Sequence, residues 1–198
     1  MTTKYLIKNV EVSGVVSDIA IENETITAIG KSLKSDGATE FDFTGSLALP
    51  GLVDLHTHLR EPGKEDAETV LSGSQAAARG GFTAISAMAN TSPVADTAGV
   101  VEQVYRLGQS AGLVDVFPIG AVTQGIQGEH LAEIGAMADS AARVRVFSDD
   151  GNCVFDPLVM RRALEYIKKF DGVVAQHAQE PRLTQASQMN EGFVSSQL

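Results

Sequence analysis

The stretch at 52–63 reads LVDLHTHLREPG, a short apolar run that leads into two histidines. His56 and His58 are two residues apart, and alternate residues of a β-strand point to the same side. At the carboxyl end of a strand in a βα-barrel, that side faces the mouth where active sites lie. Two imidazoles placed there are a chelating pair for a divalent metal, usually zinc. Two partly buried structural histidines would give the same spacing, but the direct continuation into Arg-Glu-Pro-Gly favours metal ligands.

From residue 51 onward, strand patterns alternate with helical patterns. After the strand at 52–56, strands are expected at 82–88, 114–119, 143–147 and 173–175, with helices at 67–79, 97–111 and 131–139. Asp156 followed by Pro157 is typical of a helix start. The alternation predicts a parallel sheet with crossover helices. A doubly wound sheet and a (β/α)8 TIM-type barrel both fit. Since no G-x-G-x-x-G follows a strand, the barrel is favoured. At about 30 residues per βαβ unit, about five of eight units are expected, an incomplete barrel.

The first fifty residues have a different pattern. Short β-branched or aromatic runs are separated by Gly, Ser and Asn clusters, and Pro50-Gly51 marks their end. This pattern predicts a small antiparallel β unit. We therefore expect a small β-sandwich-type domain at 1–50 and a partial metal-dependent hydrolase barrel at 51–198.

Composition restricts the class of protein. The chain has 198 residues, 43% of them hydrophobic and 20% charged, which is typical of a globular protein. Fifteen basic against twenty-five acidic residues give a net charge of −10, which argues against a nucleic-acid or anionic-membrane partner. The one cysteine excludes a disulfide framework within the chain. No signal peptide or membrane-spanning run is evident, so a cytoplasmic protein is expected.

Two further candidate ligands follow later strands. Asp150 lies in the FSDDG segment at 147–151, and His177 follows the strand expected at 173–175. Carboxylates and imidazoles at strand ends can bind metal, and a carboxylate can bridge two ions. Taken alone, the 147–151 segment would indicate an ordinary Asp-Gly turn. Taken alone, His177 would be interpreted as a structural histidine. Together with His56 and His58, these residues at the ends of three strands favour one metal site.

Substrate contacts are expected from Arg60 and Asn90. Arg60 follows the histidine pair, and Asn90 lies just beyond the second barrel strand. An arginine fork and a side-chain amide can both hold a carboxylate, so an anionic substrate is indicated. A turn before Ser92-Pro93 is an equally good interpretation of Asn90. His130 is expected at the surface, and Cys153 is interpreted as structural because no base is spaced to activate it.

Five segments occur in the order known from one enzyme family. DLHTHLREPG (54–63), AARGGFT (77–83), NTSPV (90–94) with Asp96-Thr97, FSDDG (147–151) and VAQH (174–177) together span most of the chain. They resemble dihydroorotases of the amidohydrolase superfamily, nearest to the bacterial long-chain type. Ala89 stands where this family often has proline.

The resemblance implies a zinc hydrolase that reversibly converts L-dihydroorotate to N-carbamoyl-L-aspartate in de novo pyrimidine synthesis. By this resemblance, His56 and His58 bind one zinc ion, Asp150 bridges two and His177 binds the second, with Asp149 the less suitable aspartate. His58, Arg60 and Asn90 are implied as substrate-binding residues. Whether one or two zinc ions bind stays open.

The same resemblance implies residues for which this sequence has no counterpart. A further histidine ligand follows the sixth strand of the family barrel, and a catalytic aspartate, the general acid/base, follows the eighth. One alternative is therefore a truncated, non-catalytic partner of aspartate transcarbamoylase. Another is a different cyclic-amide hydrolase, such as an allantoinase or hydantoinase. A homo-oligomer is also expected, because an incomplete barrel leaves strand edges unpaired.

Overall fold

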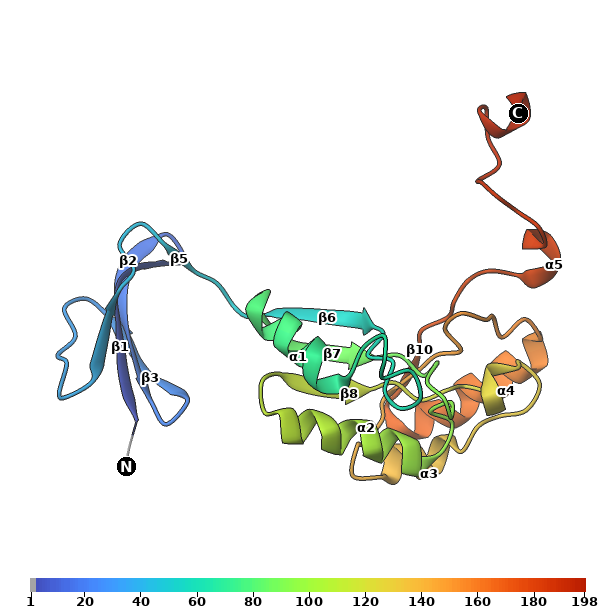
Figure 1. The fold of residues 1–198 in the computed structure, drawn as a ribbon, viewed down its shortest axis with the longest axis horizontal. Helices are drawn as coiled ribbons and strands as arrows, with labels where there is room; N and C mark the ends of the chain where they lie inside the picture. The colour runs from blue at the N-terminus through green and yellow to red at the C-terminus, as the bar shows by residue number, and fades with distance from the viewer. Residues whose placement is uncertain (1–2) are drawn as a thin grey trace. The chain divides into compact units, whose positions relative to one another are not determined.

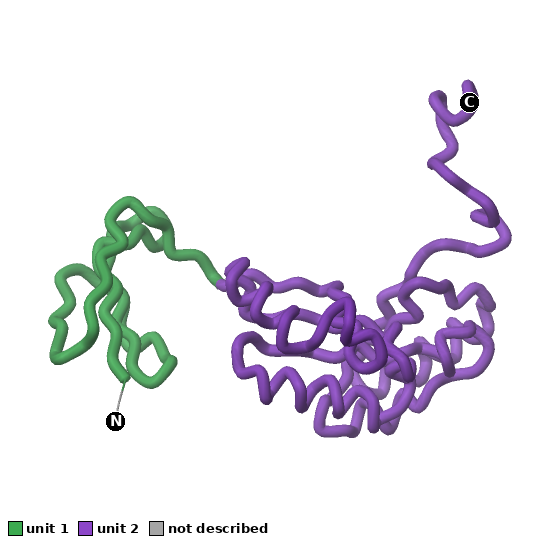
Figure 2. Tube along the Cα trace, in the orientation of Figure 1, with its two compact units in different colours: residues 1–50 green, residues 51–198 purple. Residues whose placement is uncertain are grey.

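The computed structural model describes residues 3–198, which divide into two compact units at Pro50 and Gly51 (Figure 2). The first unit is one five-stranded sheet in the order β3-β2-β1-β4, with β5 also paired to β1 (Figure 1). Its strands are β1 (Lys4–Val12), β2 (Val15–Glu22), β3 (Thr25–Gly30), β4 (Thr39–Asp42) and β5 (Leu47–Ala48). β1, β2 and β3 are antiparallel neighbours, as predicted, whereas β4 and β5 run parallel to β1. The sheet is therefore mixed, and the prediction of a wholly antiparallel unit was wrong for these two strands, because strand direction depends on long-range pairing with β1.

The second unit alternates strands with helices, and its mixed α/β character agrees with the sequence-based prediction. Its strands are β6 (Leu52–Thr57), β7 (Phe82–Ala87), β8 (Asp115–Pro118), β9 (Val146–Phe147) and β10 (Val173–Val174). Its α-helices are α1 (Val70–Arg79), α2 (Ala98–Ala111), α3 (Ile134–Asp139), α4 (Pro157–Ile167) and α5 (Pro181–Thr184). Short 3-10 turns lie at η1 (Gln124–Ile126), η2 (Lys168–Phe170) and η3 (Ser195–Gln197).

All neighbouring strands of this unit are parallel and follow one another in chain order. β6, β7 and β8 form one ladder, and β9 pairs with β10. Gly120, just after β8, joins the two ladders: its amide donates to Val146 O (3.1 Å), and its carbonyl accepts from Ser148 N (2.8 Å). Parallel strands place their carboxyl ends at one edge. The segments after β6, β7, β9 and β10 therefore meet there.

Local hydrogen bonds explain where helix boundaries differ from the expected ones. α1 begins at Val70 rather than near residue 67, because Thr69 and Ser72 form a capping box. α4 begins where the sequence predicts: the Asp156 carboxylate accepts from Leu158 N and Val159 N. β9 is shorter than the strand expected at 143–147, because Val144 N donates to Met137 O instead of to a strand.

One face of β6–β8 packs against α1 and α2. Ile85 and Val116 of the sheet pack with Val70 and Val104 of these helices. Gly108 of α2 allows this close approach, since a Cβ built there would lie 2.5 Å from Val116 Cβ. A second cluster surrounds fully buried Phe147 and includes residues of α3 and α4.

The opposite face of these strands is apolar but exposed. Val53, Leu55 and Phe117 are each more than half exposed and line a cavity of about 490 Å³. Among residues 3–198, each helix is too short or too polar to cross a membrane.

Candidate metal centre

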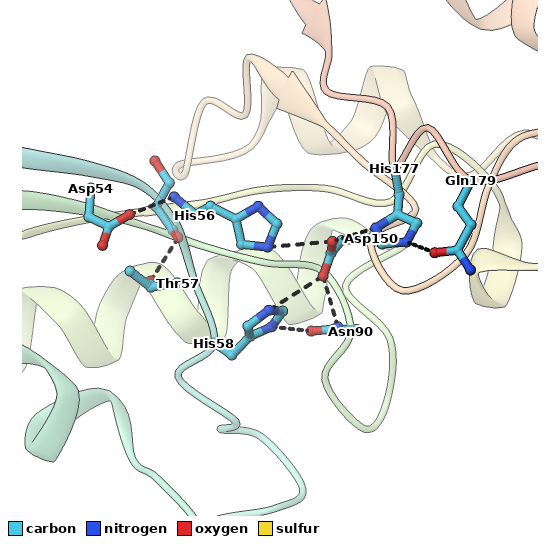
Figure 3. Close-up of polar contacts among 9 residues, drawn as sticks. Asp54, His56, Thr57, His58, Asn90, Asp150, His177 and Gln179 are labelled. Carbon is cyan, nitrogen blue, oxygen red and sulfur yellow. Dashed lines mark hydrogen bonds and ion pairs between the residues drawn. The ribbon is translucent and has the colours of Figure 1, made fainter. Parts of the chain in front are cut away.

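Three histidines surround one buried carboxylate at the carboxyl edge of the sheet (Figure 3). Asp150 follows β9, and its side chain is only 8% exposed. Its Oδ1 lies 3.4 Å from His56 Nε2 and 3.2 Å from His177 Nδ1, and its Oδ2 lies 3.5 Å from His58 Nε2. The strand ends therefore bring together residues that are more than ninety positions apart in sequence.

His56 at the end of β6 and His58 just after it present two imidazoles to the same carboxylate. The rings of His56 and His58 lie 5.1 Å apart in an edge-to-face arrangement. One donor atom each from His56, His58 and Asp150 lies within 4.8 Å of the others. Imidazole nitrogens and carboxylate oxygens are common ligand atoms of zinc and of divalent transition metals in proteins. This donor set fits a metal ion, and His177 adds a further imidazole on the other side of Asp150.

Two carboxamides form hydrogen bonds to this cluster. Asn90, after β7, places Oδ1 3.0 Å from His58 Nδ1 and donates from Nδ2 to Asp150 Oδ2 (3.2 Å). Gln179 places Oε1 3.2 Å from His177 Nε2. Gln179 was not predicted as a site residue from the sequence. The signal available was its position two residues after a candidate ligand.

Asp149 points away from the histidines and serves a different purpose. Its fully buried carboxylate accepts hydrogen bonds from Val122 N (2.8 Å) and Thr123 N (3.0 Å), and from the Thr123 hydroxyl. Burial raises the pKa of this carboxyl above its ordinary value, although these hydrogen bonds act in the opposite direction. The Thr123 hydroxyl oxygen in turn accepts from Gly128 N (2.8 Å). Asp149 thus ties the end of β9 to the loop after β8.

Within residues 3–198, no side-chain hydrogen bond or ion pair joins Arg60, His130 or Cys153 to the histidine cluster. Arg60 adopts a left-handed backbone conformation with φ of 61°, and its guanidinium forms no hydrogen bond or ion pair within residues 3–198. His130 is exposed, as expected. Cys153 is partly buried, and its sulfur accepts from Gln176 Nε2 (3.1 Å). A cavity of about 590 Å³ beside His177 is lined in part by Cys153 and Arg182.

Comparison with known proteins identifies relatives of this chain. The family described as Dihydro-orotase-like matches residues 45–197. The dihydroorotase of Leifsonia xyli subsp. xyli is 68% identical over 182 residues, 92% of this chain and 42% of that protein. The dihydroorotase of Streptomyces coelicolor is 62% identical over 197 residues, 99% of this chain and 46% of that protein. The chain thus spans less than half the length of these relatives.

Solved structures show the same fold at low sequence identity. L-hydantoinase from Arthrobacter aurescens superposes with a TM-score of 0.75 at 22% identity, covering 94% of this chain and 43% of that one. A crystal structure of a dihydroorotase gives a TM-score of 0.60 at 13% identity, covering 90% of this chain and 52% of that one. The chain therefore has part of the α/β fold that these two structures share. Within that class, the chain belongs to the dihydroorotase-like family, which confirms the family expected from its motifs.

Proposed function

We propose that this protein is a dihydroorotase, which reversibly hydrolyses the cyclic amide of L-dihydroorotate to N-carbamoyl-L-aspartate in the cytoplasm. The observation that carries the proposal is the convergence of three imidazoles on the Asp150 carboxylate. It occurs in a chain 68% identical to a protein named dihydroorotase. A hydrolase of this class needs a site that activates water beside a bound amide, and the cluster supplies the donors for such a site.

In this proposal, zinc is the metal. His56, His58 and Asp150 would hold one ion, and His177 with Asp150 would hold a second. Bound zinc supplies Lewis-acid chemistry, which polarises a carbonyl and acidifies water toward neutral pH. The chain's own residues keep the donors in place: Asn90 hydrogen-bonds to Asp150, and Asp149 ties down the neighbouring loop.

Arg60 and Asn90 are proposed to hold the substrate carboxylate. The Arg60 guanidinium has no internal ion-pair partner among the described residues, so its charge is available to an anion. An amide nitrogen carries two hydrogens, so Asn90 can donate one to Asp150 and one to the substrate. Orientation by these two groups would place the ring amide of dihydroorotate beside Asp150.

The unit at 51–198 is proposed to form about five of the eight βα units of a barrel. Support comes from the chain-order parallel ladder and from the exposed apolar face that carries Val53, Leu55 and Phe117. In a barrel such a face lies inside and is filled by side chains from the remaining strands.

Zinc binding tests the metal centre directly. Equilibrium zinc titration of the metal-free chain should give tight binding that is lost in His58→Ala and in Asp150→Ala. His130→Ala is the matched control, because this exposed histidine lies outside the cluster, and it should bind as the parent does. Equal affinity in all four proteins would contradict the proposed centre.

Substrate specificity is tested with the zinc-loaded chain. Ultraviolet absorbance measures the ring opening of dihydroorotate. Calorimetry measures whether dihydroorotate binds saturably. Arg60→Ala should weaken binding by about tenfold or more, the scale of a charge-assisted hydrogen bond. Arg79→Ala, an exposed arginine at the end of α1, is the control. Binding of a hydantoin or allantoin in preference to dihydroorotate would overturn the substrate assignment. Binding without turnover would favour the non-catalytic alternative.

A further inference from the structure

The Glu61 side chain joins the segment after β6 to the first turn of α1. Its Oε2 accepts a hydrogen bond from the amide of Val70 (2.7 Å), the first residue of that helix. The first amides of a helix have no partner within the helix, and a negative charge beside them is stabilised by the helix dipole. Val70 is fully buried in the cluster between α1 and the sheet. The Glu61 carboxylate is therefore bonded to a helix end that the core holds in place.

Arg60, the residue before Glu61, has a backbone conformation that needs such support. Its φ is 61°, a value that an L side chain rarely adopts and that costs free energy. Glu61 N donates to Leu59 O (2.7 Å), which closes a three-residue turn with Arg60 at its centre. Leu59 is buried in the same cluster as Val70. The turn is thus anchored by Leu59 on one side and by Glu61 on the other.

The same segment is also tied to the loop that carries Asn90. Ser92 N donates to Pro62 O (2.9 Å). Gly63 lies directly against Ser92, since a Cβ built on this glycine would lie 2.1 Å from Ser92 O. Arg60 is two residues from Pro62, and Asn90 is two residues from Ser92. The two residues proposed to hold the substrate carboxylate therefore lie on loops that are bonded to one another.

We propose that Glu61 is a positioning residue, which fixes the backbone of Arg60 through its bond to Val70 and so sets the orientation of the Arg60 guanidinium toward the substrate carboxylate. The inference rests on the proposed function, because it adds a role for Glu61 to the binding of an anionic substrate by Arg60. A guanidinium binds a carboxylate best when its planar fork faces the two oxygens, so affinity depends on how the arginine is held. The partner of Glu61 is a helix amide and not a residue of the histidine cluster, so loss of this bond should weaken substrate binding and leave zinc binding unchanged.

Dihydroorotate binding to the zinc-loaded chain measures this role. In calorimetry, Glu61→Ala should weaken binding by about three- to tenfold, a part of the loss expected when the Arg60 side chain itself is removed. Glu61→Gln keeps an oxygen that can accept from Val70 N, and it should retain most of the affinity. In an Arg60→Ala background, Glu61→Ala should cause no further loss, because the guanidinium that it positions is absent. Zinc affinity should be equal in all of these proteins.

Thr69→Ala is the matched control. The Thr69 hydroxyl oxygen accepts from Ser72 N (3.0 Å), so this variant also removes a cap from the first turn of α1 but no bond of the Arg60 turn. It should bind dihydroorotate as the parent chain does, and circular dichroism checks that each variant is folded. Unchanged affinity in Glu61→Ala, an equal loss in Thr69→Ala, a further loss in the Arg60→Ala background or a parallel loss of zinc affinity would overturn the inference.

NMR of the metal-free chain gives a second readout, which needs no substrate. The amide and α protons of one residue lie closer together at positive φ, so the NOE between them is stronger there. Arg60 should show this strong NOE in the parent chain and in Glu61→Gln, and should lose it in Glu61→Ala. Its absence in the parent chain, or an unchanged NOE in Glu61→Ala, would refute the role of Glu61. The expected NOE changes in a chain that binds no dihydroorotate would support that role and contradict the proposed function alone.

Discussion

The Asp149 carboxylate offers a test of how the end of β9 is held in place. In Asp149→Ala, the amides of Val122 and Thr123 lose their shared acceptor in a fully buried environment. Each unsatisfied buried donor costs about 1–3 kcal/mol, so two cost about 2–6 kcal/mol. Burial raises the pKa of the Asp149 carboxyl, which means that the folded state bears a cost for desolvating this group. The alanine variant no longer bears that cost, so part of the loss is offset. We therefore expect a loss of about 2–4 kcal/mol in the free energy of unfolding.

Denaturant unfolding followed by helical circular dichroism measures this loss. In the described residues, the α-helices all lie in the unit at 51–198, so the signal follows the unit that contains Asp149. Asp149→Asn keeps an acceptor for the two amides and should lose much less stability than the alanine variant. Asp139→Ala, at the exposed end of α3, is the matched control and should change stability by less than about 0.5 kcal/mol. A loss below about 1 kcal/mol for Asp149→Ala, or equal losses for the alanine and asparagine variants, would refute the reasoning.

Further predictions concern the helices that position the sheet. Gly108→Ala should destabilise the unit by about 1–3 kcal/mol, because its Cβ would lie 2.5 Å from Val116 Cβ. Gly99→Ala in the same helix is the control, because a Cβ there meets nothing within 4 Å, and it should be neutral or stabilising by up to about 1 kcal/mol. Thermal unfolding measures both changes, and equal effects of the two would contradict the packing argument. Asp156→Ala removes the N-cap of α4 and should cost about 0.5–2 kcal/mol, with Asp156→Ser restoring most of it in the same assay.

Short-range sequence signals predicted the parts of the fold that depend on neighbouring residues. The apolar run before His56 indicated β6, and the Asp156-Pro157 pair indicated the start of α4. Both signals act within one turn or one strand. Family resemblance added the expectation that Asp150, rather than Asp149, belongs with the histidines. In the structure, Asp150 contacts the histidines and Asp149 contacts the loop after β8.

The contacts that the sequence did not reveal are long-range. The strand after α3 is reduced to Val146–Phe147, because Val144 bonds back to Met137. Asn90 was expected to contact substrate, but its bonds to His58 and Asp150 depend on the ends of three strands meeting. Hydrogen-bond partners this far apart are set by strand pairing, and no local propensity encodes them.

The order in which the donors of the metal centre come together has a kinetic consequence. His56, in β6, and His58, just after it, are two residues apart and lie close together from the moment that strand forms. Asp150 reaches them only when β7, β8 and β9 have been added. Contacts between distant residues require loop closure and form slowly. A cation present during refolding would therefore meet the histidine pair first and gain its carboxylate ligand only as the sheet completes.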